Sequence, residues 1–229
     1  MRVCQFRHFG DDWQYIVKVF SRQITYNLLM DEKAFITAAQ KGDVAAFNQL
    51  VRAYQALVYR TAYRVLGDDA SAQDATQDAL VSAYKHIRSY RGGSFKAWLL
   101  RIVTNACYDQ LRVKQLRPTA SLDAMLIDPD NPAPGADKAA PESPQDFAER
   151  QELGAAIQRG LNILSPDQRL ALVLVDIEGF DYDEAAHAMD TNVGTIKSRL
   201  SRARAALRDF LTAQEELLPS RYRLHSEKV

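Results

Sequence analysis

The residues best suited to binding chemistry are basic side chains concentrated in the segment from Asn192 to Arg208, which reads NVGTIKSRLSRARAALR. Five basic residues and no acidic residue occur between positions 193 and 208, namely Lys197, Arg199, Arg202, Arg204 and Arg208. Such side chains pair with phosphate groups and donate hydrogen bonds to the edges of bases. The segment therefore indicates binding of a nucleic acid.

The same segment has the pattern of an amphipathic helix capped by Asn192. Its apolar residues follow a 3-4-3-4 spacing that forms one stripe, which consists of Val193, Ile196, Leu200, Ala203 and Leu207. The opposite face carries small and polar side chains that suit a major groove: Gly194, Ser198, Ser201 and Arg202, with Thr195 and Lys197 at its shoulders. Arg199 and Arg204 lie nearer the stripe, where they suit phosphates or a neighbouring helix.

A shorter helix is predicted just upstream, in the segment FDYDEAAHAMD. Asp181 is its expected N-cap, and its inward residues are Tyr182, Ala185, Ala186 and Met189. A helix, a short turn and a basic helix make a helix-turn-helix, whose second helix reads DNA. The alternative is an ordinary surface helix with a solvated basic face, and the preceding helix makes that alternative much weaker.

Composition argues against an enzyme, a metal site or a cofactor site. Cys4 and Cys107 are the only cysteines, neither belongs to a CxxC pair, and Cys107 is expected to be a buried helix residue. The four histidines are scattered, so neither a triad nor a metal cluster is indicated. No apolar run approaches the roughly 18 residues of a membrane span. We expect a cytoplasmic protein with no stable membrane insertion, no cofactor and no bound metal.

The formal net charge is zero, but the charge is segregated along the chain. Residues 31–118 carry 13 basic and 8 acidic groups, a net charge of +5, whereas residues 146–190 carry 3 and 10, a net charge of −7. Because non-specific DNA affinity follows the number of phosphates neutralised, such a chain should bind DNA weakly by itself. This balance favours a subunit that a larger partner delivers to DNA.

Helical periodicity predicts an all-α protein of two small helical domains joined by a flexible, proline-rich linker. Residues 31–118 are expected to form a helical bundle, with a second helix that stops at Gly67, a third helix from Asp68 or Asp69 to about Tyr90 and a fourth helix capped by Ser94. The expected linker covers 119–145, and the helix-turn-helix domain covers 146–212. The second helix of that domain is expected to open with a capping box of Ser165 and Gln168. Residues 1–30 are an N-terminal extension or a mis-assigned start, and 213–229 are a tail without a strong pattern.

Two segments resemble a known family. The helix-turn-helix segment FDYDEAAHAMDTNVGTIKSRLSRARAALR is similar to region 4 of sigma-70 family factors, and AWLLRIVTNACYDQLR is similar to their region 2. The second carries the spacing W-x6-N-x3-D-x2-R, formed by Trp98, Asn105, Asp109 and Arg112. With two such domains and a short linker, the chain resembles the extracytoplasmic-function (ECF) group of sigma factors over residues 31–212.

The resemblance implies partners and site residues. The implied partners are core RNA polymerase, promoter DNA and an anti-sigma factor. Core polymerase would dock on Asp74, Gln77, Asp78 and Tyr84. The minus-10 element would be melted and held by Tyr90, Phe95, Lys96, Arg101, Asn105, Asp109 and Arg112. The minus-35 element would be read by Thr195, Lys197, Ser198, Arg199, Ser201 and Arg202.

The sequence also departs from the family pattern. Asp190 occupies the turn position of the helix-turn-helix where glycine is usual, and it adopts a left-handed conformation less readily than glycine does. Gln73 and Ala75 stand where Glu and Leu are commoner in the family. These departures bear on the strength of polymerase docking and on the geometry of the turn.

The leading hypothesis is a promoter-specificity subunit without catalysis of its own. The alternative is a self-sufficient helix-turn-helix regulator that dimerises through residues 31–118 and binds palindromic sites without polymerase. The near-neutral net charge and the second basic helix, at 95–117, count against that alternative.

Overall fold

The computed structural model describes residues 31–116 and 144–213, and all regular structure within these ranges is helical. The predicted N-terminal extension, and nearly all of the predicted linker and of the predicted C-terminal tail, lie outside the described residues. The N-terminal bundle consists of α2 (Glu32–Gln40), α3 (Val44–Leu66), α4 (Asp69–His86), the 3-10 turn η1 (Ile87–Ser89) and α5 (Phe95–Leu116). The all-α prediction is confirmed.

Local capping residues set the helix boundaries of the bundle. Asp43 accepts a hydrogen bond from the amide of Ala46 at 3.1 Å, and Asp68 accepts one from the amide of Ser71 at 2.9 Å. Gly67 ends α3 in the left-handed region at φ 82°, a conformation that glycine adopts without strain. The predicted stop at Gly67 is confirmed, and of the two predicted candidates for the next cap, Asp68 and Asp69, the structure uses Asp68. The third helix ends at His86 and not near Tyr90, because η1 takes up the intervening residues.

A row of buried alanines lets α4 pack closely against α3 and α5. The row consists of Ala72, Ala75, Ala79 and Ala83, and α3 and α5 supply large residues such as Leu57, Val58, Leu99 and Leu100. Cys107 is also fully buried, as predicted, and burial raises the pKa of its thiol to about 12. The bundle therefore has its own apolar core.

The C-terminal unit consists of α6 (Pro144–Asn162), α7 (Pro166–Leu172), the π-helical segment η3 (Val173–Ile177), α8 (Tyr182–Ala188) and α9 (Val193–Ala213). Ser165 forms the predicted capping box with Gln168 at the start of α7, and Pro166 occupies the first turn. The first helix begins at Pro144, two residues before the expected domain start near Asp146. The π-helical segment was not predicted.

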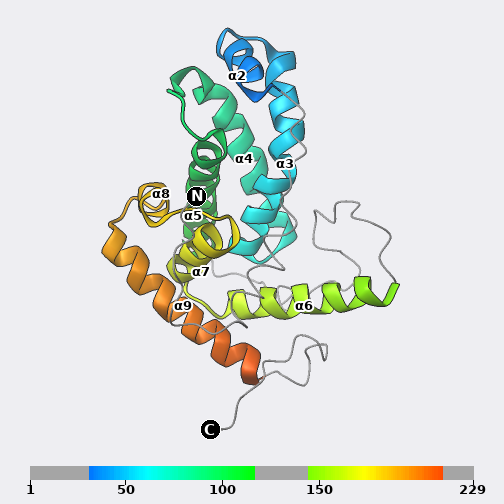
Figure 1. The fold of residues 1–229 in the computed structure, drawn as a ribbon, viewed down its shortest axis with the longest axis vertical. Coiled ribbons are helices and arrows are strands. Elements are labelled where there is room, and N and C mark those ends of the chain that lie inside the picture. Colours follow the sequence, from blue (N-terminus) through cyan, green and yellow to red (C-terminus); the bar gives the residue numbers. More distant parts are fainter. Residues whose placement is uncertain (1–30, 117–143, 214–229) are drawn as a thin grey trace.

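The N-terminal bundle and the C-terminal unit pack against each other. Helix α3 contacts α6, α7 and η3, while α5 contacts α8 (Figure 1). Helices α6 and α9 lie across one end of the bundle, and α7 lies between α9 and the bundle (Figure 1). Because the sequence shows only local periodicity, this packing was not foreseen.

Within residues 31–116 and 144–213, none of the helices is both long enough and apolar enough to span a membrane.

Candidate nucleic-acid and polymerase interfaces

The helix-turn-helix is built from α8, a tight turn and α9. Asp181 and Glu184 form a reciprocal capping box at the start of α8, with bonds of 2.7 and 3.0 Å. Asn192 accepts hydrogen bonds from both the amide (2.8 Å) and the hydroxyl (3.1 Å) of Thr195, which fixes the start of α9 as predicted. Asp190 sits between the helices at φ 48°, so the turn keeps its left-handed residue without glycine.

The predicted apolar stripe of α9 faces the core of the C-terminal unit. Ile196, Leu200, Ala203 and Leu207 are all buried, and Val193 is half-buried. Helix α9 packs on α6, α7 and α8 through this stripe. The rotation of α9 about its axis is therefore fixed by apolar burial, and the opposite face is left to solvent.

Two of the five basic side chains of α9 are used inside the protein. Arg204 is buried and forms a bidentate ion pair with Asp176 of η3, with N–O distances of 2.9 and 2.5 Å. Burial lowers the pKa of Arg204, but the hydrogen bond and charge of Asp176 outweigh burial and raise the pKa above its ordinary value. This pair ties α9 to η3, in agreement with the predicted neighbouring-helix role of Arg204.

Arg199 is also engaged within the C-terminal unit. Its guanidinium forms an ion pair with Asp167 of α7, and Asp167 in turn accepts a hydrogen bond from Tyr108. Sequence reasoning placed Arg199 among the minus-35 contacts, but the structure turns it toward α7. The reason is its position at the edge of the apolar stripe, where a helical side chain reaches a packed neighbour.

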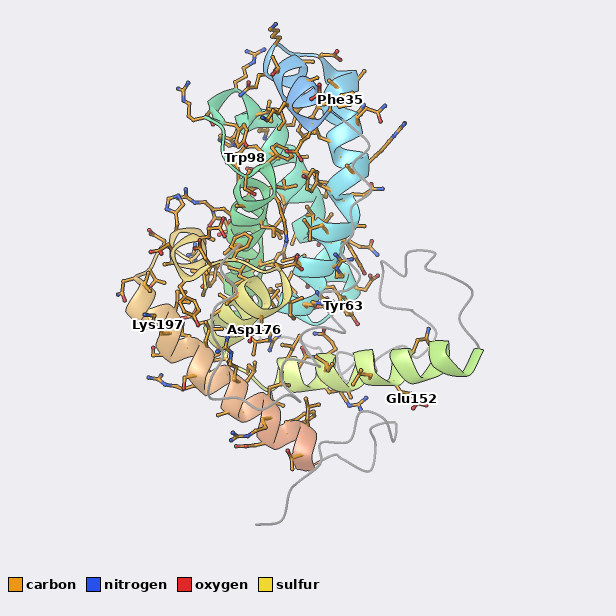
Figure 2. The ribbon with its side chains drawn as sticks, viewed as in Figure 1. Phe35, Tyr63, Trp98, Glu152, Asp176 and Lys197 are labelled. Atoms are coloured by element: carbon orange, nitrogen blue, oxygen red, sulfur yellow. The ribbon has the colours of Figure 1, made fainter. Side chains whose placement is uncertain are left out.

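The remaining predicted minus-35 residues lie on the outward face of α9 or at its N-terminus. Lys197, Ser201 and Arg202 are exposed, and the ammonium of Lys197 lies 5.8 Å from the ring centroid of Tyr182. Figure 2 shows Lys197 at the end of α9 beside α8. Ser198 donates its hydroxyl to the backbone carbonyl of Thr195 at 2.9 Å, and the Thr195 hydroxyl is bonded to Asn192. Both residues are half-buried, and both hydroxyls are already bonded locally. The exposed groups form a compact polar and basic surface.

The loop between η1 and α5 is closed by an aromatic cluster. The rings of Tyr90, Phe95 and Trp98 lie 5.3 to 5.6 Å apart, and the Tyr90 hydroxyl donates to the carbonyl of Gly93 at 2.8 Å. Tyr90 is 9% exposed and Phe95 is 2% exposed. Both rings pack under the loop against Trp98, so in this structure neither of these two predicted minus-10 residues presents its ring to a base. Gln40 also holds the loop, donating to the Tyr90 carbonyl at 2.8 Å.

One face of α5 presents the other predicted minus-10 residues. Arg101, Asn105, Asp109 and Arg112 are exposed, and their spacing places them along one side of the helix. The first three line a shallow groove between α4 and α5, together with Asp78, Ser82 and His86 of α4. Sequence reasoning missed Ser82 and His86, because no local pattern shows that α4 lies beside this face.

Lys96 and Arg101 contact the C-terminal unit in this structure. The Lys96 ammonium donates to the backbone carbonyl of Glu178 at 2.5 Å, and Arg101 lies 2.7 Å from the Nε2 atom of His187. Both side chains were predicted to face DNA. Both side chains are therefore already bonded within the protein, because α8 packs against α5 and Glu178 follows η3, which packs against α3.

The predicted polymerase-docking residues share the solvent face of α4. Asp74, Gln77 and Asp78 are exposed, and Tyr84 is 44% exposed with its ring edge against Phe47. Val81 is an exposed apolar residue on the same helix that sequence reasoning missed. Acidic, amide, aromatic and apolar side chains together make a surface suited to a protein partner.

Comparison with known families assigns both parts of the chain. The model of sigma-70 region 2 matches residues 50–117, and that of sigma-70 region 4 matches residues 154–207. The ECF RNA polymerase sigma factor SigE of Mycolicibacterium smegmatis is 36% identical over 173 residues, which are 74% of this chain and 64% of that relative. The ECF RNA polymerase sigma-E factor of Escherichia coli K12 is 34% identical, over 78% of this chain and 93% of the relative.

Solved structures show the same fold. The sigma factor RpoE, in complex with the anti-sigma factor NepR from Bartonella quintana, matches with a TM-score of 0.54 and 32% identity, over 73% of this chain and 98% of RpoE. CnrH, in complex with the cytosolic domain of CnrY, matches with a TM-score of 0.55 and 26% identity, over 80% of this chain and 97% of CnrH. By its two matched regions and its relatives, the chain belongs to the ECF family of RNA polymerase sigma factors.

Proposed function

We propose that this chain binds core RNA polymerase and directs it to promoters, with no catalysis of its own. The observation that carries the proposal is the outward face of α9, where Lys197, Ser201 and Arg202 are exposed on a rigidly positioned helix-turn-helix. Small hydroxyls beside long basic side chains let a helix enter a major groove and reach base edges. Because the chain belongs to the ECF family of RNA polymerase sigma factors, core RNA polymerase is its expected partner.

The division of labour follows the two matched regions. Residues 31–118 form the part that binds core polymerase and the minus-10 element, residues 119–145 form the linker, and residues 146–212 form the part that reads the minus-35 element. The exposed face of α4 supports the first assignment and the exposed face of α9 supports the last. Because RpoE and CnrH were solved with regulatory partners, we also propose that an anti-sigma factor controls this chain, and that both act in the cytoplasm.

Arg202→Ala is expected to weaken minus-35 recognition by about 1–3 kcal/mol, the usual worth of a good base contact. Arg202 is exposed on the outward face of α9, so its removal leaves the core of the unit intact. Fluorescence anisotropy of the polymerase complex on matched and scrambled minus-35 duplexes measures the effect. Arg159→Ala, which removes the same charge from α6, is the control and should bind both duplexes as wild type does. An equal loss on both duplexes would show that Arg202 contacts phosphate only.

Arg101→Ala combined with Asn105→Ala is expected to impair transcription from duplex promoters. Both side chains are exposed on the α5 face beside the groove, where they can hold a displaced strand. Unstacking a base costs a few kcal/mol, which protein contacts to the opened strand offset. On a template already mismatched across the minus-10 element, that cost is gone and activity should largely return. The same defect on both templates would rule out a role in melting.

The second candidate function is the self-sufficient dimeric regulator, and the comparisons do not favour it. The relatives of this chain are RNA polymerase sigma factors, and both sigma-70 regions are matched. A gel shift with and without core polymerase separates the two functions. We expect sequence-specific binding only when core polymerase is present; tight binding to a palindrome by the chain alone would favour the regulator.

A further inference from the structure

A buried carboxylate joins the two halves of the protein. The side chain of Glu178, at the end of η3, has no exposed surface. From α3, Thr61 donates its hydroxyl to Oε1 at 3.2 Å, and the Nη1 atom of Arg64 lies 3.5 Å from the same oxygen. From α5, the ammonium of Lys96 lies 3.7 Å from Oε2 and 2.5 Å from the Glu178 carbonyl. One acidic residue of the C-terminal unit is thus held by three side chains of the N-terminal bundle.

Further contacts between the two halves lie at the C-terminal end of α3. The last turn of α3 has carbonyls without helical partners, and the C-terminal unit supplies donors to them. Arg169 donates to the Val65 carbonyl at 2.8 Å, and Gln158 donates to the Arg64 carbonyl at 3.4 Å. Gly67, just beyond α3, lies so near Asn162 that an added Cβ would be 2.6 Å from the amide oxygen. The C-terminal end of α3 is therefore hydrogen-bonded to α6 and α7 and packs closely against α6.

This contact occupies the surface that the proposed function assigns to minus-10 DNA. Lys96 pairs with Glu178, and Arg101 lies against His187 of α8. While the halves are packed together, Lys96 is paired with Glu178 and the exposed Arg101 is bonded to His187, so a single strand must compete with these partners for the two cations. Resting on the proposed function, we propose that Glu178 is an intramolecular latch: its carboxylate takes the place of a DNA phosphate on Lys96 and keeps the chain in a closed, DNA-masked state until polymerase and promoter separate the halves.

The chemistry of the contact suits a reversible latch. A carboxylate is costly to bury alone, so the closed state depends on the cations of Arg64 and Lys96. The charged and hydrogen-bonded groups of this contact can also separate, because water rehydrates each of them. DNA phosphates carry the same charge as Glu178 and compete for Lys96. The Lys96 ammonium can therefore pair either with Glu178 in the closed state or with a DNA phosphate in the open state, but not with both.

Glu178→Gln tests the latch in the full chain. The amide keeps a hydrogen-bond acceptor for Thr61 but removes the charge that holds Arg64 and Lys96. The matched control is Asp183→Asn, which removes the same charge from an exposed residue of α8. Small-angle X-ray scattering should show a larger radius of gyration for Glu178→Gln only. The apparent Kd equals the intrinsic Kd divided by the open fraction, so affinity for a minus-10 single-stranded oligonucleotide should rise roughly tenfold.

Two outcomes overturn the latch. One is a wild-type radius of gyration for Glu178→Gln; the other is expansion without a gain in oligonucleotide affinity over Asp183→Asn. If Glu178→Gln loses helicity by circular dichroism, Arg64→Met probes the same contact from α3, and the same expansion is required of it. Run-off transcription by wild type with core polymerase keeps the two proposals distinct. Absence of a transcript overturns the proposed function, whereas the scattering measurement reports on the latch without polymerase or DNA.

Discussion

Arg204→Ala is expected to destabilise the C-terminal unit by about 3–5 kcal/mol, the usual effect of removing one partner from a buried ion pair. Arg204 and Asp176 are both buried, and their bidentate contact ties α9 to η3. Alanine would leave the Asp176 carboxylate buried without its cation, besides removing packed side-chain volume. Urea unfolding followed by circular dichroism measures the loss, and minus-35 binding should be lost with the fold.

Arg208→Ala is the matched control for this effect. It removes the same charge from an exposed position on the same helix, where Arg208 pairs only with its neighbour Asp209 within the described ranges. We expect a change within about 0.5 kcal/mol, as for other surface substitutions. Arg204→Met combined with Asp176→Leu should recover much of the loss, because no charge then remains buried. A loss of less than about 1 kcal/mol for Arg204→Ala would contradict the buried-pair account.

Asp74→Lys combined with Asp78→Lys is expected to abolish binding to core polymerase while the helical fold stays intact. Both carboxylates are exposed on α4, and the buried alanines of that helix lie on its other face. Placing like charges across an interface costs several kcal/mol, so affinity should fall at least on the order of a hundredfold. Co-purification with core enzyme measures binding, and circular dichroism checks the fold.

The control for this charge reversal changes as many charges elsewhere. Glu152→Lys combined with Asp183→Lys reverses two exposed carboxylates of the C-terminal unit. This double variant should co-purify with core polymerase as wild type does. If the α4 variant also co-purifies unchanged, the docking surface lies on another part of the chain.

Local signals in the sequence predicted much of the fold. Gly67, Asp68 and Asn192 each act within one helical turn, so their capping roles could be read from neighbouring residues alone. The apolar stripe of α9 was predictable for the same reason: a helix of period 3.6 shows its buried face in its own sequence. These predictions are confirmed.

Contacts between distant segments were not predictable in this way. Even the ring contact of Tyr90 with Trp98, only eight residues further on, was not predictable, because it depends on the path of the loop between η1 and α5 and not on helical periodicity. Glu178 looks like an ordinary solvated acid beside Gly179, and its partners lie more than eighty residues away in α3 and α5. Arg199 and Arg204 differ from Arg202 only by their angle on the helix, which suggested a different role but could not name the acid that pairs with each.

The central claim is that this chain gives promoter specificity to a polymerase that does the chemistry. Run-off transcription with purified core RNA polymerase tests it most directly, on genomic fragments enriched by the complex. We expect no specific transcript from core enzyme alone, and discrete transcripts on adding the chain, from start sites preceded by shared minus-35 and minus-10 sequences. The account would be contradicted if the chain alone bound these fragments tightly and no transcript appeared when core enzyme was added.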